Sequence, residues 1–244
     1  MTEIRKEALR RLAYIGLAVL IGIPFINSNG KERWITLVAF LFVMFQFIRI
    51  VIKSQQLIDD LFPPKVTNET TATKGNKIIY NISMGLFFGG LVAMIFEATP
   101  IGNTIHGTKF FWTAASIGIA AFVLTIIFLK TKFASVFDES SRRYSVCFGY
   151  LFGFFLGVPA AARFLNDALA KPEIECKDFT VVRKSTGGAR TTAYFIFCKL
   201  DGGEERFEVI KPFWDKVEEN KTVELCLKKG YFGYDYVTEF KIPN

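Results

Sequence analysis

The side chains that could act as acids, bases, nucleophiles or metal ligands are few and scattered along this chain of 244 residues. Its only histidine is His106, in a loop at 101–107, and its four cysteines show none of the spacings typical of a metal site. Enzymes need a positioned acid, base, nucleophile or metal ion. We therefore expect no catalytic residue, no metal ligand and no cofactor-binding residue, and hence no enzymatic activity.

Two cysteines are placed so that they could meet. A hairpin turn centred on Gly187 sets Cys176 opposite Cys198 on neighbouring antiparallel strands. Facing cysteines can approach the distance of a disulfide, and an oxidising compartment favours that bond. The alternative is that both remain buried thiols. Cys226 is expected to face away from the core, and Cys147 lies in an apolar segment.

Ionisable residues are scarce within the apolar segments, where such residues often mark functional sites. Glu97 and Arg163 each lie near the outer end of an apolar segment. Because the two residues reach a similar depth, one hypothesis is an ion pair between the third and fifth segments. The alternative is two charges that are solvated separately at the membrane surface.

Aromatic residues near the C-terminus offer a surface for binding. Trp214, Tyr231, Tyr234 and Tyr236 are candidates for contact with a protein or a ligand, and packing in the core is the alternative. Residues 172–244 carry 12 Lys and Arg against 13 Asp and Glu, whereas nucleic-acid binding requires a basic aromatic face. We therefore expect no nucleic-acid partner.

The elements that must position these residues are mostly apolar. Hydrophobic residues make up 51% of the sequence, and the mean hydropathy is +0.30. Residues 1–171 contain runs close to the roughly 20 residues that cross a bilayer. The pattern predicts an α-helical transmembrane bundle with five spans, at 12–26, 34–52, 78–96, 110–129 and 144–165. The first run also resembles a signal peptide, although no small-residue cleavage site follows it.

Lys and Arg residues in the connections predict the orientation, because they resist translocation across the membrane. Thirteen lie at the N-terminus and in segments 49–77 and 130–143, against five on the other side of the predicted membrane. This bias places the N-terminus in the cytoplasm and, after an odd number of spans, residues 172–244 outside it. The expected location is the plasma membrane, with the inner membrane of a bacterium favoured. Four spans would return the C-terminal domain to the cytoplasm.

Small residues at regular intervals predict where helices pack, because close approach of helices in lipid requires them. Gly149, Gly153 and Gly157 follow one another at intervals of four residues, and Gly85 and Gly89 repeat this interval in the third span. The pattern favours packing within one bundle. A homo-oligomer contact on the last helix is the alternative.

From residue 172 onward, short apolar stretches alternate with turn residues, which is typical of a small β domain. Five strands are predicted, at 174–184, 190–200, 204–211, 222–228 and 231–242, with a short helix at 212–219. This order of elements predicts an OB-like barrel at 172–244, and an SH3-like barrel is the competing prediction.

Several stretches of this domain, at 191–197, 200–202, 206–209 and 227–233, resemble small β domains appended to transmembrane helices in uncharacterised bacterial membrane proteins. The resemblance lies in the pattern of apolar and turn residues over 172–244. It implies a membrane-attached β domain and no catalytic residues. We assign no such resemblance to residues 1–171.

These features together predict a non-enzymatic, multi-pass membrane protein that presents an extracytoplasmic β domain to a protein or a ligand. Membrane lipid and a second copy of the chain are the other expected partners. The alternative is a transporter, channel or membrane-disrupting effector, which would be expected to show paired intramembrane charges or discontinuous helices.

Overall fold

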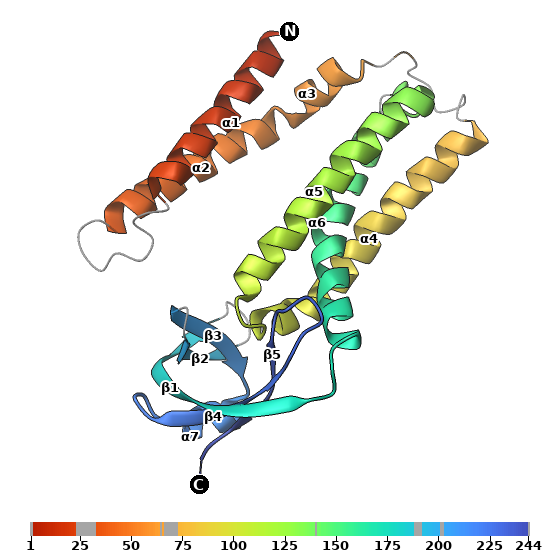
Figure 1. Ribbon diagram of the computed structural model, residues 1–244. Helices are drawn as coiled ribbons and strands as arrows, with labels where there is room; N and C mark the ends of the chain where they lie inside the picture. The colour runs from red at the N-terminus through yellow and green to blue at the C-terminus, as the bar shows by residue number, and fades with distance from the viewer. Residues whose placement is uncertain are drawn as a thin grey trace. The chain divides into compact units, whose positions relative to one another are not determined.

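The chain folds into two compact units (Figure 1). The computed structural model describes residues 2–22, 33–63, 65, 73–139, 141–187, 192–200 and 203–243. The first unit comprises Met1–Tyr80 and Leu129–Val146, and the second comprises Asn81–Phe128 and Cys147–Asn244. Three long helices therefore begin or end in the first unit and continue in the second.

The first unit is built on three helices, α1 (Glu3–Gly22), α2 (Arg33–Ile52) and α3 (Ser54–Leu61). Helices α1 and α2 lie side by side (Figure 1). Between them, Arg11 Nη1 donates a hydrogen bond of 2.8 Å to Gln46 Oε1, and Gln46 is only 6% exposed. Large apolar side chains of α2, such as Leu41 and Phe45, are exposed instead. The first unit thus buries a polar contact and exposes apolar residues.

Ion pairs tie α3 to its neighbours in this unit. Arg5 of α1 lies 2.5 Å from Asp60, and Arg143 lies 2.5 Å from Asp59. Phe62, directly after α3, stacks on Phe137 of the 3₁₀ helix η3 (Ala134–Phe137) with ring centres 4.2 Å apart. The segment 130–143, predicted as a connection, is therefore packed against α3.

Three helices are long and apolar enough to cross a membrane: α4 (Lys74–Gly102), α5 (Gly107–Lys132) and α6 (Arg142–Ala168). Each is about 40 Å long at 1.5 Å per residue, which exceeds the roughly 30 Å hydrocarbon core of a bilayer. The predicted spans at 78–96, 110–129 and 144–165 lie within these helices.

The prediction of five spans is not supported at its first two positions. Among the described residues, α1 does not qualify as a span, because Glu3, Arg5, Lys6, Glu7, Arg10 and Arg11 occupy its first half. Helix α2 qualifies only jointly with α3, since Val38–Ile52 and Ser54–Leu61 are bent by 52°. The end of the predicted first span, residues 23–26, lies outside the described residues.

The glycines of α6 lie where helices approach closely. A Cβ atom at Gly149 would lie 2.7 Å from the Ser83 carbonyl oxygen of α4, and one at Gly153 would lie 2.8 Å from the Leu86 Cβ. Both distances are shorter than atoms tolerate. Larger side chains at these two positions would therefore force α4 and α6 apart.

The remaining glycines of the predicted motif differ from one another. A Cβ at Gly157 would meet the Gly90 Cα at 3.5 Å, which is ordinary contact. A Cβ at Gly85 or Gly89 would meet no described atom within 4 Å. Gly90, which was not singled out, is the glycine of α4 that faces α6.

The C-terminal residues form five antiparallel strands in the order β3-β2-β1-β4-β5, curled into a half-barrel. The strands are β1 (Ile174–Gly187), β2 (Ala193–Leu200), β3 (Gly203–Val209), β4 (Thr222–Lys228) and β5 (Tyr236–Lys241). A short helix, α7 (Lys211–Lys216), separates β3 from β4. Five strands with a helix after the third are confirmed, but the sheet is a half-barrel and not a closed barrel.

The sheet curls because the long strand β1 pairs with two different strands along its length. Residues 174–180 of β1 pair with β4, and residues 181–187 pair with β2. Inside the curl, buried residues of all five strands form one core, with Phe207, Ile196, Leu225, Val181 and Val223 as its largest fully buried members. The core thus stabilises the two halves of the sheet together.

Candidate functional site at the junction of helices and half-barrel

The connection between α4 and α5 lies across the open side of the half-barrel. Asn103 Oδ1 accepts a hydrogen bond of 3.0 Å from Glu208 N, and its Nδ2 donates to Glu208 O at 3.3 Å. The backbone oxygen of Asn103 accepts a hydrogen bond of 3.0 Å from Val237 N. Glu208 belongs to β3 and Val237 to β5, so one residue is bonded to both edge strands.

The next residues of this connection continue the pairing with β5. Thr104 is buried and forms an isolated antiparallel bridge with Tyr236, and Ile105 N donates to Asp235 O at 2.7 Å. His106 has a positive φ of 56° and its Nδ1 lies 2.8 Å from Glu205 Oε1 of β3. The only imidazole of the chain therefore helps to fix the loop to the sheet.

The end of α6 holds the half-barrel from a second direction. The Asn166 side chain is 0% exposed, its Nδ2 donates to Tyr234 O at 2.8 Å, and its Oδ1 accepts from Phe232 N at 2.9 Å. The backbone oxygen of Asn166 accepts from Tyr231 N at 3.0 Å. Residues 231–234, which lead into β5, are thus bonded to α6 through one buried amide.

A charged cluster adjoins Asn166. Asp167 Oδ1 accepts hydrogen bonds from the Tyr236 hydroxyl and from Lys228 Nζ, and its Oδ2 lies 3.7 Å from Arg163 Nη1. Arg163 also lies over the Tyr236 ring at 4.3 Å. Burial and the hydrogen bond to Asp167 raise the pKa of Tyr236, and hydrogen bonds with Tyr236 and Asp167 raise the pKa of Lys228. The cluster therefore favours a neutral tyrosine and a charged lysine.

The predicted ion pair between Glu97 and Arg163 is replaced by this cluster. The partner of Arg163 is Asp167, one turn further along the same helix, and its guanidinium is buried against Tyr236. The sequence placed Arg163 and Glu97 at one depth but could not show that the sheet would pack on the end of α6.

The predicted pairing of Cys176 with Cys198 is wrong. Cys176 forms a disulfide with Cys226, its direct partner in the β1–β4 register, and Cys198 is a buried free thiol opposite Val181. The register differs because β1 continues through Gly187, the residue predicted as the centre of the turn. Burial in the core raises the pKa of the Cys198 thiol to about 12.

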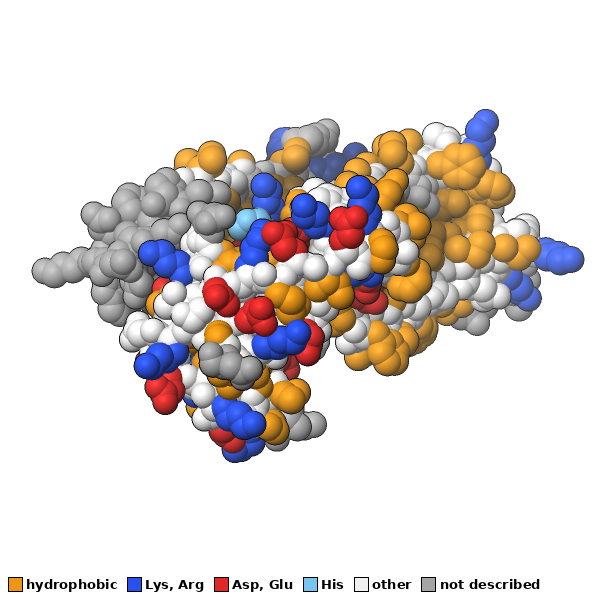
Figure 2. Space-filling view, turned by 60° about the horizontal axis from the view of Figure 1, so that its bottom comes forward, with side chains coloured by type: hydrophobic (Ala, Val, Ile, Leu, Met, Phe, Trp, Pro, Cys, Tyr) orange, Lys and Arg blue, Asp and Glu red, His pale blue; other side chains and the backbone are white. Residues whose placement is uncertain are grey.

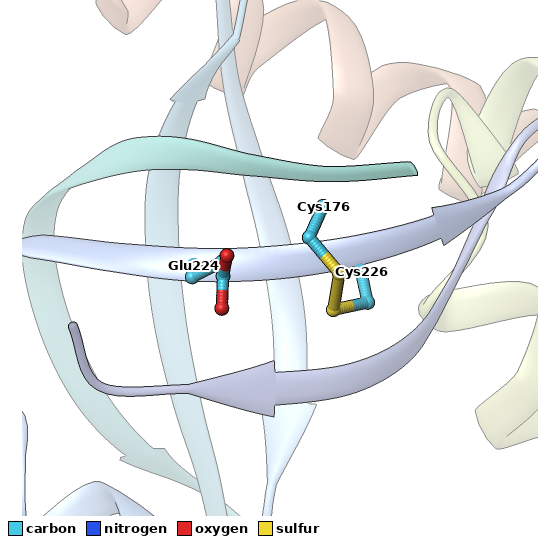
Figure 3. A group of neighbouring side chains, drawn as sticks. All are labelled: Cys176, Glu224 and Cys226. Carbon is cyan, nitrogen blue, oxygen red and sulfur yellow. A yellow bond between two sulfur atoms is a disulfide. The ribbon is translucent and has the colours of Figure 1, made fainter. Parts of the chain in front are cut away.

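The disulfide lies beside a carboxylate. Figure 3 shows Glu224 next to the Cys176–Cys226 disulfide along β4. The two sulfur atoms and a carboxylate oxygen of Glu224 lie within 4.8 Å of one another. Three such atoms could hold a metal ion only if the cysteines were reduced, because sulfur binds metals as the thiolate.

The four aromatic residues predicted as a contact surface occupy different environments. Tyr231 is 61% exposed, whereas Tyr236 is buried in the cluster described above. Tyr234 packs on Phe110 of α5 with ring centres 4.8 Å apart. Trp214 donates a hydrogen bond to Phe195 O at 3.1 Å. Of the four, Tyr231 is the side chain that a partner can readily reach.

A hollow of about 490 Å³ lies between β3 and β5, next to Asn103. We call it the slot; its lining comprises Thr99, Asn103, Glu208, Val209, Ile210, Phe213, Thr238, Glu239 and Phe240. Phe213 and Phe240 pack together with ring centres 5.7 Å apart, and Ile210 at the rim is 72% exposed. Figure 2 shows acidic and basic side chains intermingled over the face that carries the sheet. The slot therefore combines an aromatic wall with two carboxylates.

Sequence reasoning did not find Asn103 or Asn166. Both are single asparagines outside any motif, and the bonds that they make are to backbone atoms of β3, β5 and the 231–234 segment. A polar amide in the last turn of an apolar helix was the available signal at Asn166.

Comparisons with protein-family models, with curated proteins and with solved structures give no match for this chain.

Proposed function

We propose that this chain is a non-enzymatic, multi-pass membrane protein that holds its half-barrel rigidly outside the cytoplasm for contact with a protein or a ligand. The observation that carries this proposal is the slot between β3 and β5, which Asn103 lines on one side. A half-barrel with an aromatic wall beside its edge strands β3 and β5 is suited to binding an extended or apolar group.

Five crossings of the membrane remain part of the proposal. Helix α2 exposes apolar side chains around most of its circumference and buries Gln46 against Arg11. This inverted pattern supports a lipid environment, in which polar side chains bridge helices. If α1 and α2 both cross the membrane, or if neither does, the number of spans is odd and the half-barrel lies on the side opposite the N-terminus.

The orientation of the half-barrel is supported by two independent features. The basic residues concentrate at the N-terminus and in segments 49–77 and 130–143, which favours the cytoplasm for these parts. The Cys176–Cys226 disulfide supports an oxidising compartment for the half-barrel, since disulfides form mainly outside the cytosol. In a bacterium, the side proposed for the half-barrel is the outer side of the inner membrane.

The slot can be tested by photo-crosslinking of the full-length protein in cells. A photoreactive amino acid at Ile210, on the rim of the slot, is expected to give a discrete adduct. The same amino acid at Ile174, also an exposed isoleucine but outside the slot, is the matched control. Phe240→Ala is expected to reduce the yield from Ile210 several-fold.

Equal crosslinking from both positions, or a yield that is insensitive to Phe240→Ala, would argue against the slot as a binding site. Ion flux through the purified protein in liposomes would instead favour a channel or transporter.

A further inference from the structure

The outward face of β1 and β4 brings together four residues that can bind metal ions. In the register of these strands Cys176 is opposite Cys226, and Asp178 is opposite Glu224. Residues two apart in a strand point to the same face. The two cysteines and the two carboxylates therefore occupy the corners of one block.

This block lies on the opposite face from the hydrophobic core. Val223, Leu225 and Leu227 alternate with Glu224 and Cys226 along β4 and are buried in the core. Cys176 is exposed, whereas Cys226 beneath it is 1% exposed. A reagent in solution can thus reach the disulfide from the Cys176 side.

The carboxylates of the block are not engaged elsewhere. Within the described part of the chain, neither Glu224 nor Asp178 forms a hydrogen bond or an ion pair, whereas Glu239 on the neighbouring strand is paired with Lys241 at 3.1 Å. The closest possible ligand atoms of Cys176, Glu224 and Cys226 all lie within 4.8 Å of one another. Metal–sulfur bonds of about 2.3 Å and metal–oxygen bonds of about 2.1 Å require the two sulfur atoms to separate once the disulfide is reduced and the Glu224 oxygen to move towards them.

We propose that Cys176, Cys226 and Glu224 form a metal site that is closed by the disulfide and opened by its reduction. A zinc-like divalent ion fits this donor set of two thiolates and one carboxylate, with water or Asp178 in the fourth position. The site does not depend on the slot or on the membrane orientation.

The chemistry of opening requires a thiol or dithiol reductant. A thiolate attacks the exposed Cys176 sulfur, the bond between the two cysteines breaks, and Cys226 leaves as a thiolate. A second thiol of the reductant then releases Cys176, so that two electrons and two protons convert the disulfide to two thiols. Binding of the divalent ion displaces those two protons.

The test uses the full-length protein in detergent, titrated with Cd²⁺ as a probe whose bonds to thiolates absorb in the ultraviolet. The reduced protein, freed of excess reductant, is expected to bind one ion per chain, and the oxidised protein none. Reoxidation of the loaded protein should release the ion. Cys198 is present in both states, but its core position keeps it protonated.

Paired variants separate ligation from a general effect of charge. Glu224→Gln is expected to weaken binding at least about tenfold, the scale at which even outer partners of metal ligands act. Glu175→Gln, on the same strand pair but on the other face, is expected to leave the affinity unchanged. The proposal fails if both oxidation states bind Cd²⁺ equally, if the reduced state binds none, or if the two variants have equal effects.

Discussion

At the scale of single residues, Asn166 links α6 to the segment before β5. We expect Asn166→Ala to destabilise the protein by roughly 1–3 kcal/mol, because Tyr234 O and Phe232 N would lose the hydrogen bonds that the buried Asn166 side chain makes with them. Thermal unfolding in detergent measures this effect. Asn220→Gly is the control, since Asn220 is exposed and has a φ of 62°, which glycine adopts freely. Equal melting temperatures for both variants would contradict the role of Asn166.

Tyr236 and Lys228 make the junction sensitive to alkaline pH. The pKa of Tyr236 is raised from an ordinary value of 10.0, chiefly by burial and by its hydrogen bond to Asp167, and that of Lys228 is raised from 10.5. A pKa raised on folding stabilises the protein fully below the unfolded value, and this contribution is lost as the pH rises through the folded value. Stability should therefore fall above about pH 10.

Tyr236→Phe tests this assignment. The variant should be less stable at neutral pH, because Asp167 loses a donor, and its stability should decline less steeply above pH 10.0. Unfolding curves across the alkaline range compare the two slopes, and identical slopes would rule out Tyr236 as the titrating group.

At the scale of elements, the contact between α4 and α6 depends on selected glycines. Gly149→Ala should destabilise the protein by about 1–3 kcal/mol, because the new Cβ would lie 2.7 Å from the Ser83 oxygen. Gly85→Ala should be neutral or stabilising by up to about 1 kcal/mol, since alanine favours helix and no described atom obstructs it. Denaturation in detergent distinguishes the two. A loss of stability on Gly85→Ala would instead place a partner helix at that position.

At the scale of the whole molecule, the topology can be tested with two of the chain's three glycosylation sequons. Asn68-Glu69-Thr70 lies in the connection proposed to be cytoplasmic, and Asn220-Lys221-Thr222 lies in the half-barrel. Synthesis in the presence of microsomes should therefore attach a glycan at Asn220 and none at Asn68. Asn220→Gln should abolish the glycan, with Asn68→Gln as the matched control. Modification at Asn68 alone would reverse the proposed orientation.

Much of the architecture was predictable because it depends on local patterns. The apolar runs that became α4, α5 and α6 match the length of a bilayer crossing, and the alternation of apolar and turn residues marked the strands and the helix α7. The first two apolar runs were harder to judge, because the charges in α1 and the bend at the end of α2 interrupt runs of marginal length.

The candidate site was less predictable, since its residues are distant in sequence. Asn103 is bonded to Glu208 and Val237, and no spacing rule connects these positions. The cysteine pairing depended on where β1 ends. Because β1 continues through Gly187, Cys176 is paired with a residue of β4 and not, as predicted, with one of β2. A small error in the predicted length of one strand thus led to the wrong predicted disulfide.

The apolar helices, the strands and the distribution of basic residues follow from the order of amino acids along the chain, because these properties are carried by neighbouring residues. The folded structure was needed to show that Asn103 and Asn166 hold the half-barrel, that Arg163 faces Asp167, and that Cys176 joins Cys226. Such contacts depend on strand register and on the close packing of distant segments, which local patterns do not specify.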